Sequence, residues 1–183
     1  MNFLNSMDLI SSNEIYKKGG VVLTEKIFKS GDKEVARISL SLGKNSVLII
    51  PVDKNNKFYL GCQKRVGSND FITEFPNGGI EPGEDTMIAA KRELSEELGL
   101  EGKMVYLGKF KPFSDLVDLE VNVFLCKNAK EQHDLKRLRP DFYEKIKMKT
   151  FTEKQIYRLI KQGIIYQSYF LSSLSLYNSY KSR

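Results

Sequence analysis

Residues 78–100 read GGIEPGEDTMIAAKRELSEELGL, and the end of this stretch poses a problem in electrostatics. The pattern predicts a helix over about residues 85–98, with Asp85 or Thr86 near its N-cap and Gly99 just past its end. Three carboxylates crowd the C-terminal turns: Glu93, Glu96 and Glu97. The helix dipole favours cations there, so each misplaced charge costs about 0.3–1 kcal/mol. Something else in the structure has to compensate for this arrangement.

Projected as a helix, the segment separates into two faces. An apolar stripe is predicted to pack against a sheet, and its members are Met87, Ala90, Leu94 and Leu98. The three glutamates fall within one turn of each other on a neighbouring face. Three carboxylates that converge on one point suit a hard divalent cation, which takes oxygen ligands. The alternative interpretation is an acidic helix face directed at solvent.

The composition narrows the chemistry further. The chain has 183 residues, of which 41% are hydrophobic and 28% charged, as expected for one soluble globular domain. A single histidine and two distant cysteines, Cys62 and Cys126, argue against a zinc site and against a histidine-based triad. Catalysis in this chain is therefore expected to depend on carboxylates.

The sequence also suggests where the protein resides. No apolar run approaches the roughly 20 residues that a membrane helix needs, and residues 1–10 do not resemble a signal peptide. Both cysteines lie in apolar, strand-like runs, which is typical of buried free thiols in a reducing compartment. We therefore expect a cytoplasmic protein with no membrane partner.

Charge is divided unevenly along the chain. Residues 1–126 carry 16 Lys and Arg against 18 Asp and Glu, whereas residues 127–183 carry 13 against 5. A basic C-terminal third can attract phosphates or nucleic acid, although most such runs are simply solvated surface. Nucleic acid is accordingly the less favoured partner.

Strand signals surround the helix. Two hairpins are predicted, the first from residues 21–28 and 34–42 and the second from 46–52 and 58–62. Further strands are expected at 104–110 and 120–126, and helices at 152–162 and 168–180. Residues 75–84 are predicted to be a loop because of their prolines and glycines. Strands mixed with a few helices favour an α/β or α+β sandwich.

The spacing of Gly78, Glu84, Arg92-Glu93-Leu94, Glu96-Glu97 and Gly99-Leu100 resembles the Nudix box, and every specified position matches. The resemblance implies an α/β/α sandwich with a mixed sheet, formed by residues 46–183. It further implies an N-terminal β-hairpin extension, residues 1–45, which serves as a dimerisation region.

The resemblance also implies roles for the residues of the box. Glu93 and Glu97 would bind Mg²⁺ directly, and Glu96 directly or through water; the sequence does not choose between Mg²⁺ and Mn²⁺. Gly78 would let the backbone approach the metal, so that the carbonyl of Asn77 becomes a ligand. Arg92 is expected to pair with Glu84 and to tie the loop to the helix. Such enzymes cleave a nucleoside diphosphate linked to another group.

Residues outside the box resemble those of ADP-ribose pyrophosphatases and related nucleoside-diphosphate-sugar hydrolases. In that subfamily, residues at the positions of Arg65 and Glu74 hold the nucleotide or the terminal ribose. Phe75 would either stack on a base or belong to the core. A loop glutamate often acts as the general base, and Glu144 and Glu120 are the two candidates.

The sequence departs from that subfamily at three points, one of which is an unusually basic segment at residues 127–149. Lys111-Pro112-Phe113-Ser114 replaces its Ser-Pro-Gly-Phe, and Asn77 stands in place of an alanine. These differences leave open a dinucleoside polyphosphate or an RNA 5′ end as substrate. A non-catalytic Nudix sensing module is the third alternative, although such modules usually lose a box carboxylate and none is lost here. The resemblance finally implies a homodimer in which the N-terminal strands reach over the partner's active site.

Overall fold

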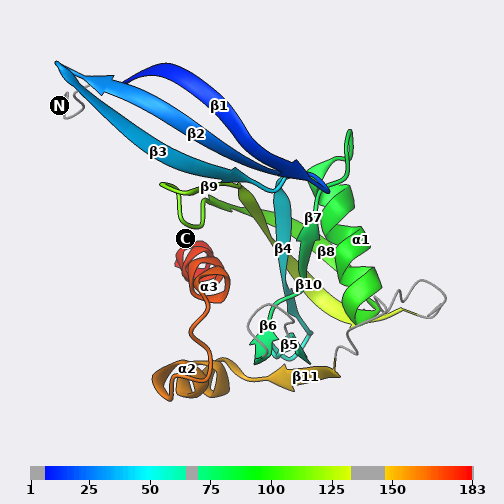
Figure 1. The fold of residues 1–183 in the computed structure, drawn as a ribbon. Coiled ribbons are helices and arrows are strands. Elements are labelled where there is room, and N and C mark those ends of the chain that lie inside the picture. The colour runs from blue at the N-terminus through cyan, green and yellow to red at the C-terminus, as the bar shows by residue number, and fades with distance from the viewer. Residues whose placement is uncertain (1–6, 65–69, 133–146, 183) are drawn as a thin grey trace. The chain divides into compact units, whose positions relative to one another are not determined.

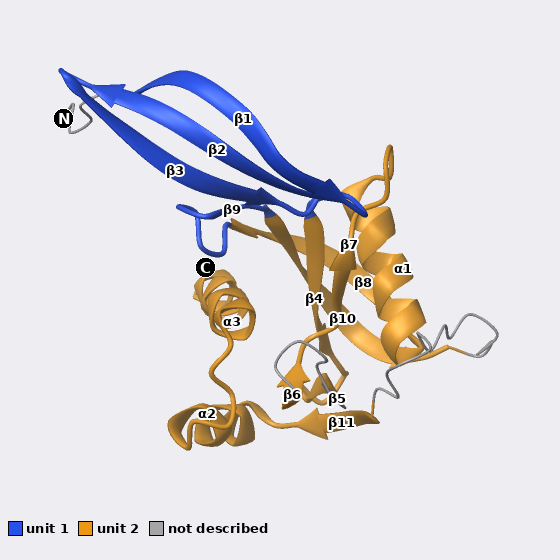
Figure 2. Cartoon of the chain, in the orientation of Figure 1, with its two compact units in different colours: residues 1–45, 111–120 blue, residues 46–110, 121–183 orange. Residues whose placement is uncertain are grey.

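A computed structural model describes residues 7–64, 70–132 and 147–182 of the chain. The chain forms two compact units (Figure 2). Unit 1 comprises residues 1–45 and 111–120, and unit 2 comprises residues 46–110 and 121–183. Each unit has its own sheet, so the two are described in turn.

The sheet of unit 2 is mixed, and its strands follow the order β11-β5-β4-β10-β8 (Figure 1). These strands are β4 (Ser46–Val52), β5 (Phe58–Lys64), β8 (Leu100–Phe110), β10 (Val121–Glu131) and β11 (Lys147–Phe151). β10 runs parallel to β4, whereas β8 pairs antiparallel with β10. Two short strands complete the sheet: β6 (Phe71–Glu74) pairs with β5, and β7 (Asn77–Gly79) pairs with β4.

Helices cover both faces of this sheet. α1 (Thr86–Leu98) packs against one face, and α3 (Ser168–Lys181) packs against the other, while α2 (Glu153–Lys161) follows β11 (Figure 1). On the α3 side, Phe170 stacks on Phe75 with ring centroids 4.3 Å apart, and Tyr177 meets Phe58 edge to face at 5.3 Å. The predicted α/β/α sandwich with a mixed sheet is therefore confirmed.

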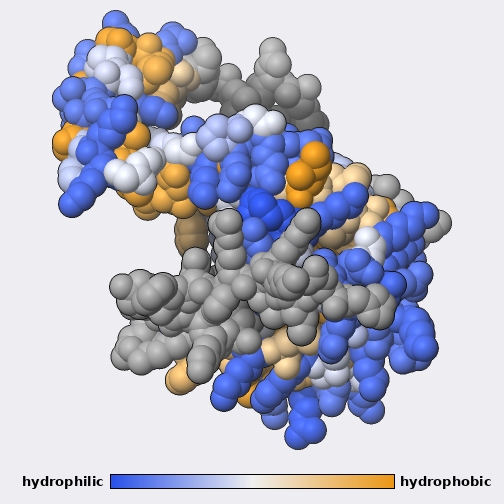
Figure 3. All heavy atoms as spheres, turned by 90° about the vertical axis from the view of Figure 1, so that its right-hand side faces the viewer, coloured by the Kyte–Doolittle hydropathy of each residue, from blue (hydrophilic) through white to orange (hydrophobic). Residues whose placement is uncertain are grey.

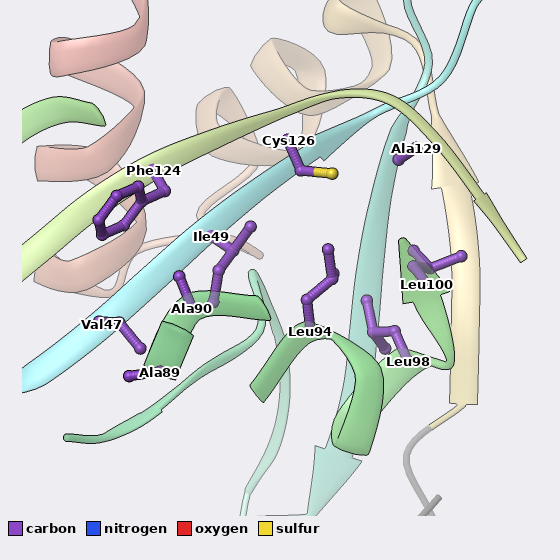
Figure 4. Close-up of a cluster of buried hydrophobic side chains, with 10 residues drawn as sticks. All are labelled: Val47, Ile49, Ala89, Ala90, Leu94, Leu98, Leu100, Phe124, Cys126 and Ala129. Atoms are coloured by element: carbon purple, nitrogen blue, oxygen red, sulfur yellow. The ribbon is translucent and has the colours of Figure 1, made fainter. Parts of the chain in front are cut away.

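The core beneath α1 explains why the helix lies where it does. Alternate residues of β4 and β10 point at the helix, and the buried cluster comprises Val47, Ile49, Ala89, Ala90, Leu94, Leu98, Leu100, Phe124, Cys126 and Ala129 (Figure 4). Burial raises the pKa of the Cys126 thiol to about 11. Cys62 is also a free thiol but is only partly buried.

The ends of α1 agree with the sequence signals. Asp85 is the N-cap, and its carboxylate accepts hydrogen bonds from the backbone N–H groups of Met87 and Ile88 at 2.8 and 3.2 Å. Gly99 ends the helix in the left-handed conformation, with φ 64°. The prediction for Met87 was wrong, because its side chain is 39% exposed. It lies in the first turn, and burial against the sheet begins only at Ala89.

Two other expectations need correction. Residues 75–84 contain a regular element after all, since β7 pairs with Ser46, Val47 and Leu48 of β4 despite its two glycines. The second hairpin is much looser than predicted, because β4 and β5 pair only at Val52 and Phe58. β5 instead pairs along its length with β11.

Unit 1 is an antiparallel sheet of β1 (Asp8–Lys18), β2 (Val21–Ser30) and β3 (Lys33–Ser41), to which β9 (Val117–Asp118) adds in parallel. The hairpin of β2 and β3 matches the predicted one. β1 was missed, because its two register shifts and its polar Ser-Ser-Asn run hide the alternation of a strand. No residue of β1, β2 or β3 is buried, so this unit presents apolar side chains on its surface.

One face of the molecule is mostly polar among the described residues. Over the face shown in Figure 3, hydrophilic residues predominate and hydrophobic residues form small separate groups. Among the helices in the described ranges, none is long and apolar enough to cross a membrane.

We predict that Leu94→Ala lowers the free energy of unfolding by about 2–5 kcal/mol, because Leu94 is fully buried at the centre of the α1 contact. Urea denaturation followed by circular dichroism measures the loss. Ile88→Ala is the matched control on the same helix, since Ile88 is 59% exposed, and its effect should stay below about 1 kcal/mol. Equal losses would contradict the packing described here.

Candidate metal and nucleotide site

The site is built where β7 meets α1. The backbone N–H of Ile49 donates to the carbonyl of Pro76 at 2.9 Å, and β7 then pairs with β4. These bonds hold the backbone of Asn77 and Gly78 against the last turns of the helix. From there the N–H of Asn77 donates to Glu97 Oε2 at 3.2 Å. The loop and the helix are thus joined directly at one of the predicted metal ligands.

Gly78 is required by the space available. A Cβ atom at this position would collide with the carboxylate of Glu93. Its φ is not positive, so the requirement here comes from close approach rather than from backbone conformation. The consequence is a cradle in which the Glu93 carboxylate, 12% exposed, lies directly on the backbone of β7.

Arg92 links the loop and three carboxylates. Its Nε and Nη2 each donate to Glu84 at 2.9 Å, and Nη2 also donates to the carbonyl of Gly79 at 3.0 Å. Nη1 donates to Glu93 Oε1 at 2.7 Å and reaches Glu96 Oε2 at 3.4 Å. The hydrogen bonds to Glu84 are the largest cause of a raised Arg92 pKa, so the guanidinium stays charged. Arg92 therefore supplies positive charge that the crowded carboxylates lack.

The carboxylates do not yet form a closed set of metal ligands. Within the ranges the structure describes, no three His, Cys, Asp or Glu side chains are gathered closely enough to hold a metal ion. The reason is visible in the contacts: Arg92 binds Glu93 and Glu96, and Asn77 binds Glu97. The chemistry of the donors, three carboxylates beside the partly buried backbone of β7, nevertheless fits a hard divalent cation. A cation would take over part of the role that Arg92 has in this conformation.

The other predicted residues lie in different places. Glu74 is partly buried at the end of β6, and Asn77 Nδ2 approaches its Oε2 at 3.5 Å, so it lies beside the box. Phe75 is 1% exposed and stacked on Phe170, which places it in the core and leaves no ring face for a base. Glu120 belongs to unit 1, where its N–H donates to the side-chain oxygen of Asn45 at 3.0 Å. Arg65 and Glu144 lie outside the described residues.

Three features of the site could not be read from the motif. They are the acceptor role of the Gly79 carbonyl, the bond from Asn77 N–H to Glu97, and the N–H of Glu81 that donates to Glu84 at 3.0 Å. All three involve backbone atoms, which the identity of a residue does not reveal. The glycines and the turn at residues 81–84 were the available signals that the backbone comes close here.

A cavity of about 870 Å³ adjoins α1 on another side. Its walls include Arg92 and Glu96 together with Ser95, Met104 and Gln132, but not Glu93, Glu97 or Asn77. Ser95 and Gln132 are bonded to each other there at 2.9 Å, and Gln132 also donates to the carbonyl of Leu100 at 3.2 Å. The cavity touches the carboxylate site only at its edge, so we do not assign the substrate to it.

Comparison with known proteins agrees with this geometry. The model of the NUDIX domain family matches residues 43–162, about two thirds of the chain. The chain belongs to the NUDIX domain family. A solved structure described as an ADP compounds hydrolase superposes with a TM-score of 0.84 at 17% identity, covering 97% of this chain and 95% of that one. At that identity the match establishes the Nudix fold alone.

Curated relatives are matched over shorter stretches. A methanol dehydrogenase activator of Bacillus methanolicus is 29% identical over 124 residues, 67% of this chain and 66% of that protein. RNA pyrophosphohydrolases of Pelagibacter ubique and Nitrobacter winogradskyi are 36% and 55% identical, over 64 and 29 residues. These two matches span 35% and 16% of this chain. The chain covers 66%, 39% and 17% of the three relatives' own lengths, less than two thirds of each.

We predict that Arg92→Lys lowers the free energy of unfolding by about 1–3 kcal/mol in metal-free buffer. A lysine keeps the charge but cannot make two parallel bonds to Glu84 and still reach Gly79. Guanidinium denaturation in the presence of a chelator measures the effect. Lys91→Ala, at the exposed neighbouring position on α1, is the control and should change stability by less than about 0.5 kcal/mol. A fully stable Arg92→Lys variant would show that the bidentate pair is dispensable.

Proposed function

We propose that this chain is a metal-dependent hydrolase of the pyrophosphate bond of ADP-ribose or a related nucleoside diphosphate sugar, with a nucleoside monophosphate and a sugar phosphate as products. The observation that carries the proposal is the complete set of box carboxylates, held against β7 by Arg92 and by the N–H of Asn77. The fold similarity to an ADP compounds hydrolase supports this choice of substrate.

In this proposal, Glu93, Glu97 and Glu96, with the carbonyl of Asn77, hold Mg²⁺ or Mn²⁺. A bound cation of this kind neutralises the diphosphate and lowers the pKa of a coordinated water. The chain's own residues then fix the geometry. Arg92 and Glu84 hold the loop on the helix, and Gly78 lets the backbone lie beside Glu93.

The reaction itself is a displacement at phosphorus. A water oxygen bonds to one phosphorus atom, the bridging P–O bond breaks, and the other phosphate leaves with the bonding electrons. A glutamate accepts the water proton, and we propose Glu144 or Glu120 for this role. Arg65 and Glu74 are proposed to hold the nucleotide or the terminal ribose, and Glu74 lies beside Asn77. Phe75 is not part of this proposal because it is buried.

A second candidate substrate is an RNA 5′ end. The two RNA pyrophosphohydrolases match this chain at 36% and 55% identity over short segments, which favours this alternative more than a dinucleoside polyphosphate. A ligand-sensing module without activity is the remaining alternative, and the intact carboxylates argue against it. The free cysteines fit a cytoplasmic location.

We further propose a homodimer formed through residues 1–45. On one face of the unit 1 sheet, the strand register brings together Tyr16, Leu23, Ile27, Ile38 and Leu40, with Glu25 among them opposite Ile38. Ile38 is 39% exposed and Tyr16 is 52% exposed, although both belong to this apolar face. A sheet without buried residues needs another surface to stabilise it. A second copy of the chain, carrying the same apolar face, meets that need.

The proposed activity predicts phosphate release from a panel of nucleotides in the presence of Mg²⁺ and a coupled phosphatase. The panel comprises ADP-ribose, ADP-glucose, GDP-mannose, a diadenosine polyphosphate and RNA with a 5′-triphosphate. Glu97→Gln and chelation by EDTA should each reduce turnover by at least about a hundredfold. Glu101→Gln is the matched control, because Glu101 is exposed on β8 and pairs with Lys130.

Each result of the panel separates the alternatives. Preferential turnover of ADP-ribose or one sugar nucleotide supports the leading proposal, and preferential turnover of RNA supports the second. Binding of a panel member without turnover would contradict catalysis and favour the sensing module. The same assay on Glu144→Gln and Glu120→Gln identifies the general base, whose loss removes the acidic limb of the pH profile of kcat, because a general base works only when deprotonated.

The dimer is tested by light scattering at micromolar concentration, where we expect twice the mass of the chain. Ile38→Lys introduces a charge into the apolar face and should yield a monomer. Ser39→Lys introduces the same charge on the opposite face of β3 and should leave the dimer intact. A monomeric unmodified protein would overturn this proposal.

A further inference from the structure

The last part of unit 2 is strongly basic. Residues 147–182, all of them described, contain six Lys and Arg against one Glu. That glutamate, Glu153, already pairs with Lys181 at 2.7 Å. Within the described part of the chain, no carboxylate forms an ion pair with the remaining five cations. This surface therefore carries positive charge that the proposed activity does not use.

The basic residues of α2 lie on one face of the helix. Lys154, Arg158 and Lys161 are spaced at i, i+4 and i+7, and all three are exposed. Tyr157 lies in the same stripe, with 44% of its side chain exposed and its hydroxyl held by Asn178 at 2.7 Å. The opposite face contains Ile156, which is fully buried. Packing on that side therefore fixes the basic stripe toward solvent.

The strand before the helix extends this surface. Lys147 and Lys149 of β11 are exposed, whereas Met148 between them packs toward the core under α1. The two lysines therefore point away from α1, to the opposite side of the sheet. α2 begins two residues after β11 ends, so the five cations form one continuous segment of chain. We call these five cations and Tyr157 the basic face.

The backbone of β11, which carries part of the basic face, runs close to Glu74 beside the carboxylate site. Met148 is the pairing partner of Gly61, and Gly61 is also the partner of Glu74. Adjacent strands are about 4.8 Å apart, so the backbone of β11 runs roughly 10 Å from Glu74. β11 is the edge strand of the sheet and its lysines point to the side opposite α1, so a polyanion bound along β11 and α2 would pass around this edge to reach the box.

Its chemistry favours single-stranded nucleic acid over other anions. Phosphate groups are neutralised by Lys and Arg, and a ring such as Tyr157 among the cations offers a stacking surface for a base. Tyr166, 60% exposed, provides a second ring shortly after α2. A membrane surface would call for a continuous apolar face on the helix, and the exposed stripe of α2 is polar apart from Tyr157.

We propose that the basic face binds single-stranded RNA. Binding of RNA is inferred from the exposed cations and the Tyr157 ring, and it does not depend on the proposed function. The further step, that the bound RNA delivers its 5′ phosphates to the carboxylates of α1, rests on the proposed function.

The test uses the full-length protein and a fluorescent single-stranded RNA of about 20 nucleotides with a 5′-hydroxyl, which offers no pyrophosphate bond to cleave. Anisotropy gives Kd over a series of salt concentrations. The triple variant Lys154→Ala, Arg158→Ala, Lys161→Ala should weaken binding by at least about tenfold. The slope of log K against log salt should fall by about 2, since each lost phosphate contact contributes about 0.7 for single strands.

Matched variants distinguish binding of RNA at this face from a general effect of the protein's net charge. Lys91→Ala, Lys103→Ala and Lys130→Ala remove three exposed cations from α1, β8 and β10 and should leave Kd within about twofold. Tyr157→Leu should weaken binding by about fivefold or more, and Tyr157→Phe, which keeps the ring but loses the bond to Asn178, should not. Equal losses in both triple variants, or binding to anionic phospholipid vesicles but not to RNA, would overturn the proposal.

Turnover distinguishes this proposal from the function on which its last step rests. If the box is active, the basic-face triple variant should retain ADP-ribose turnover while its KM for 5′-triphosphate RNA rises. If the unmodified protein cleaves nothing, the proposed function fails, yet the anisotropy result still decides whether the basic face binds RNA. An unchanged KM for RNA would overturn the delivery step alone.

Discussion

The structure of the site depends on one imbalance of charge. Glu84, Glu93 and Glu96 lie around one guanidinium, that of Arg92, and Glu97 on the same helix accepts the N–H of Asn77. Arg92 cannot neutralise all of them, but its fork binds Glu84 with two parallel bonds and still reaches the helix carboxylates and the Gly79 carbonyl. A cation at the site would meet ligands that are already oriented. The crowded carboxylates therefore destabilise the end of the helix, but they provide ligands for a cation.

The sheet supports both halves of that site, the loop at β7 and the helix α1. β4 pairs with β7, which carries the loop, and β4 also supplies Val47 and Ile49 to the core under α1. The same strand thus fixes both halves of the site. A change in the core beneath α1 would move the carboxylates relative to Asn77 and Gly78, although it touches neither residue. This explains why the central strands are apolar on both faces, since each face packs against a helix.

The sequence allowed much of this to be predicted, for physical reasons that differ between elements. Asp85 and Gly99 define the ends of α1 through local chemistry, so they could be read directly. β7 was missed because its pairing partner, β4, is distant in sequence, and β1 was missed because its register shifts and polar run hide the alternation of a strand. Phe75 was left between two roles, and only the ring of Phe170, far along the chain, places it in the core. The backbone contacts of Asn77 and Gly79 were beyond any reading of side-chain identity.

The two charged regions of unit 2 also constrain each other. An acidic site near Glu74 repels phosphate until a cation is present, whereas the basic face on β11 and α2 attracts phosphate without one. A substrate with a single diphosphate would gain little binding energy from the basic face, because the negative charge of the diphosphate lies at the box. A substrate with a chain of phosphates would gain binding energy from both regions, since its body can lie on the basic face while its end lies at the acidic box. The charge distribution along the sequence, acidic in the first 126 residues and basic afterwards, is thus a physical reason to expect discrimination by substrate length.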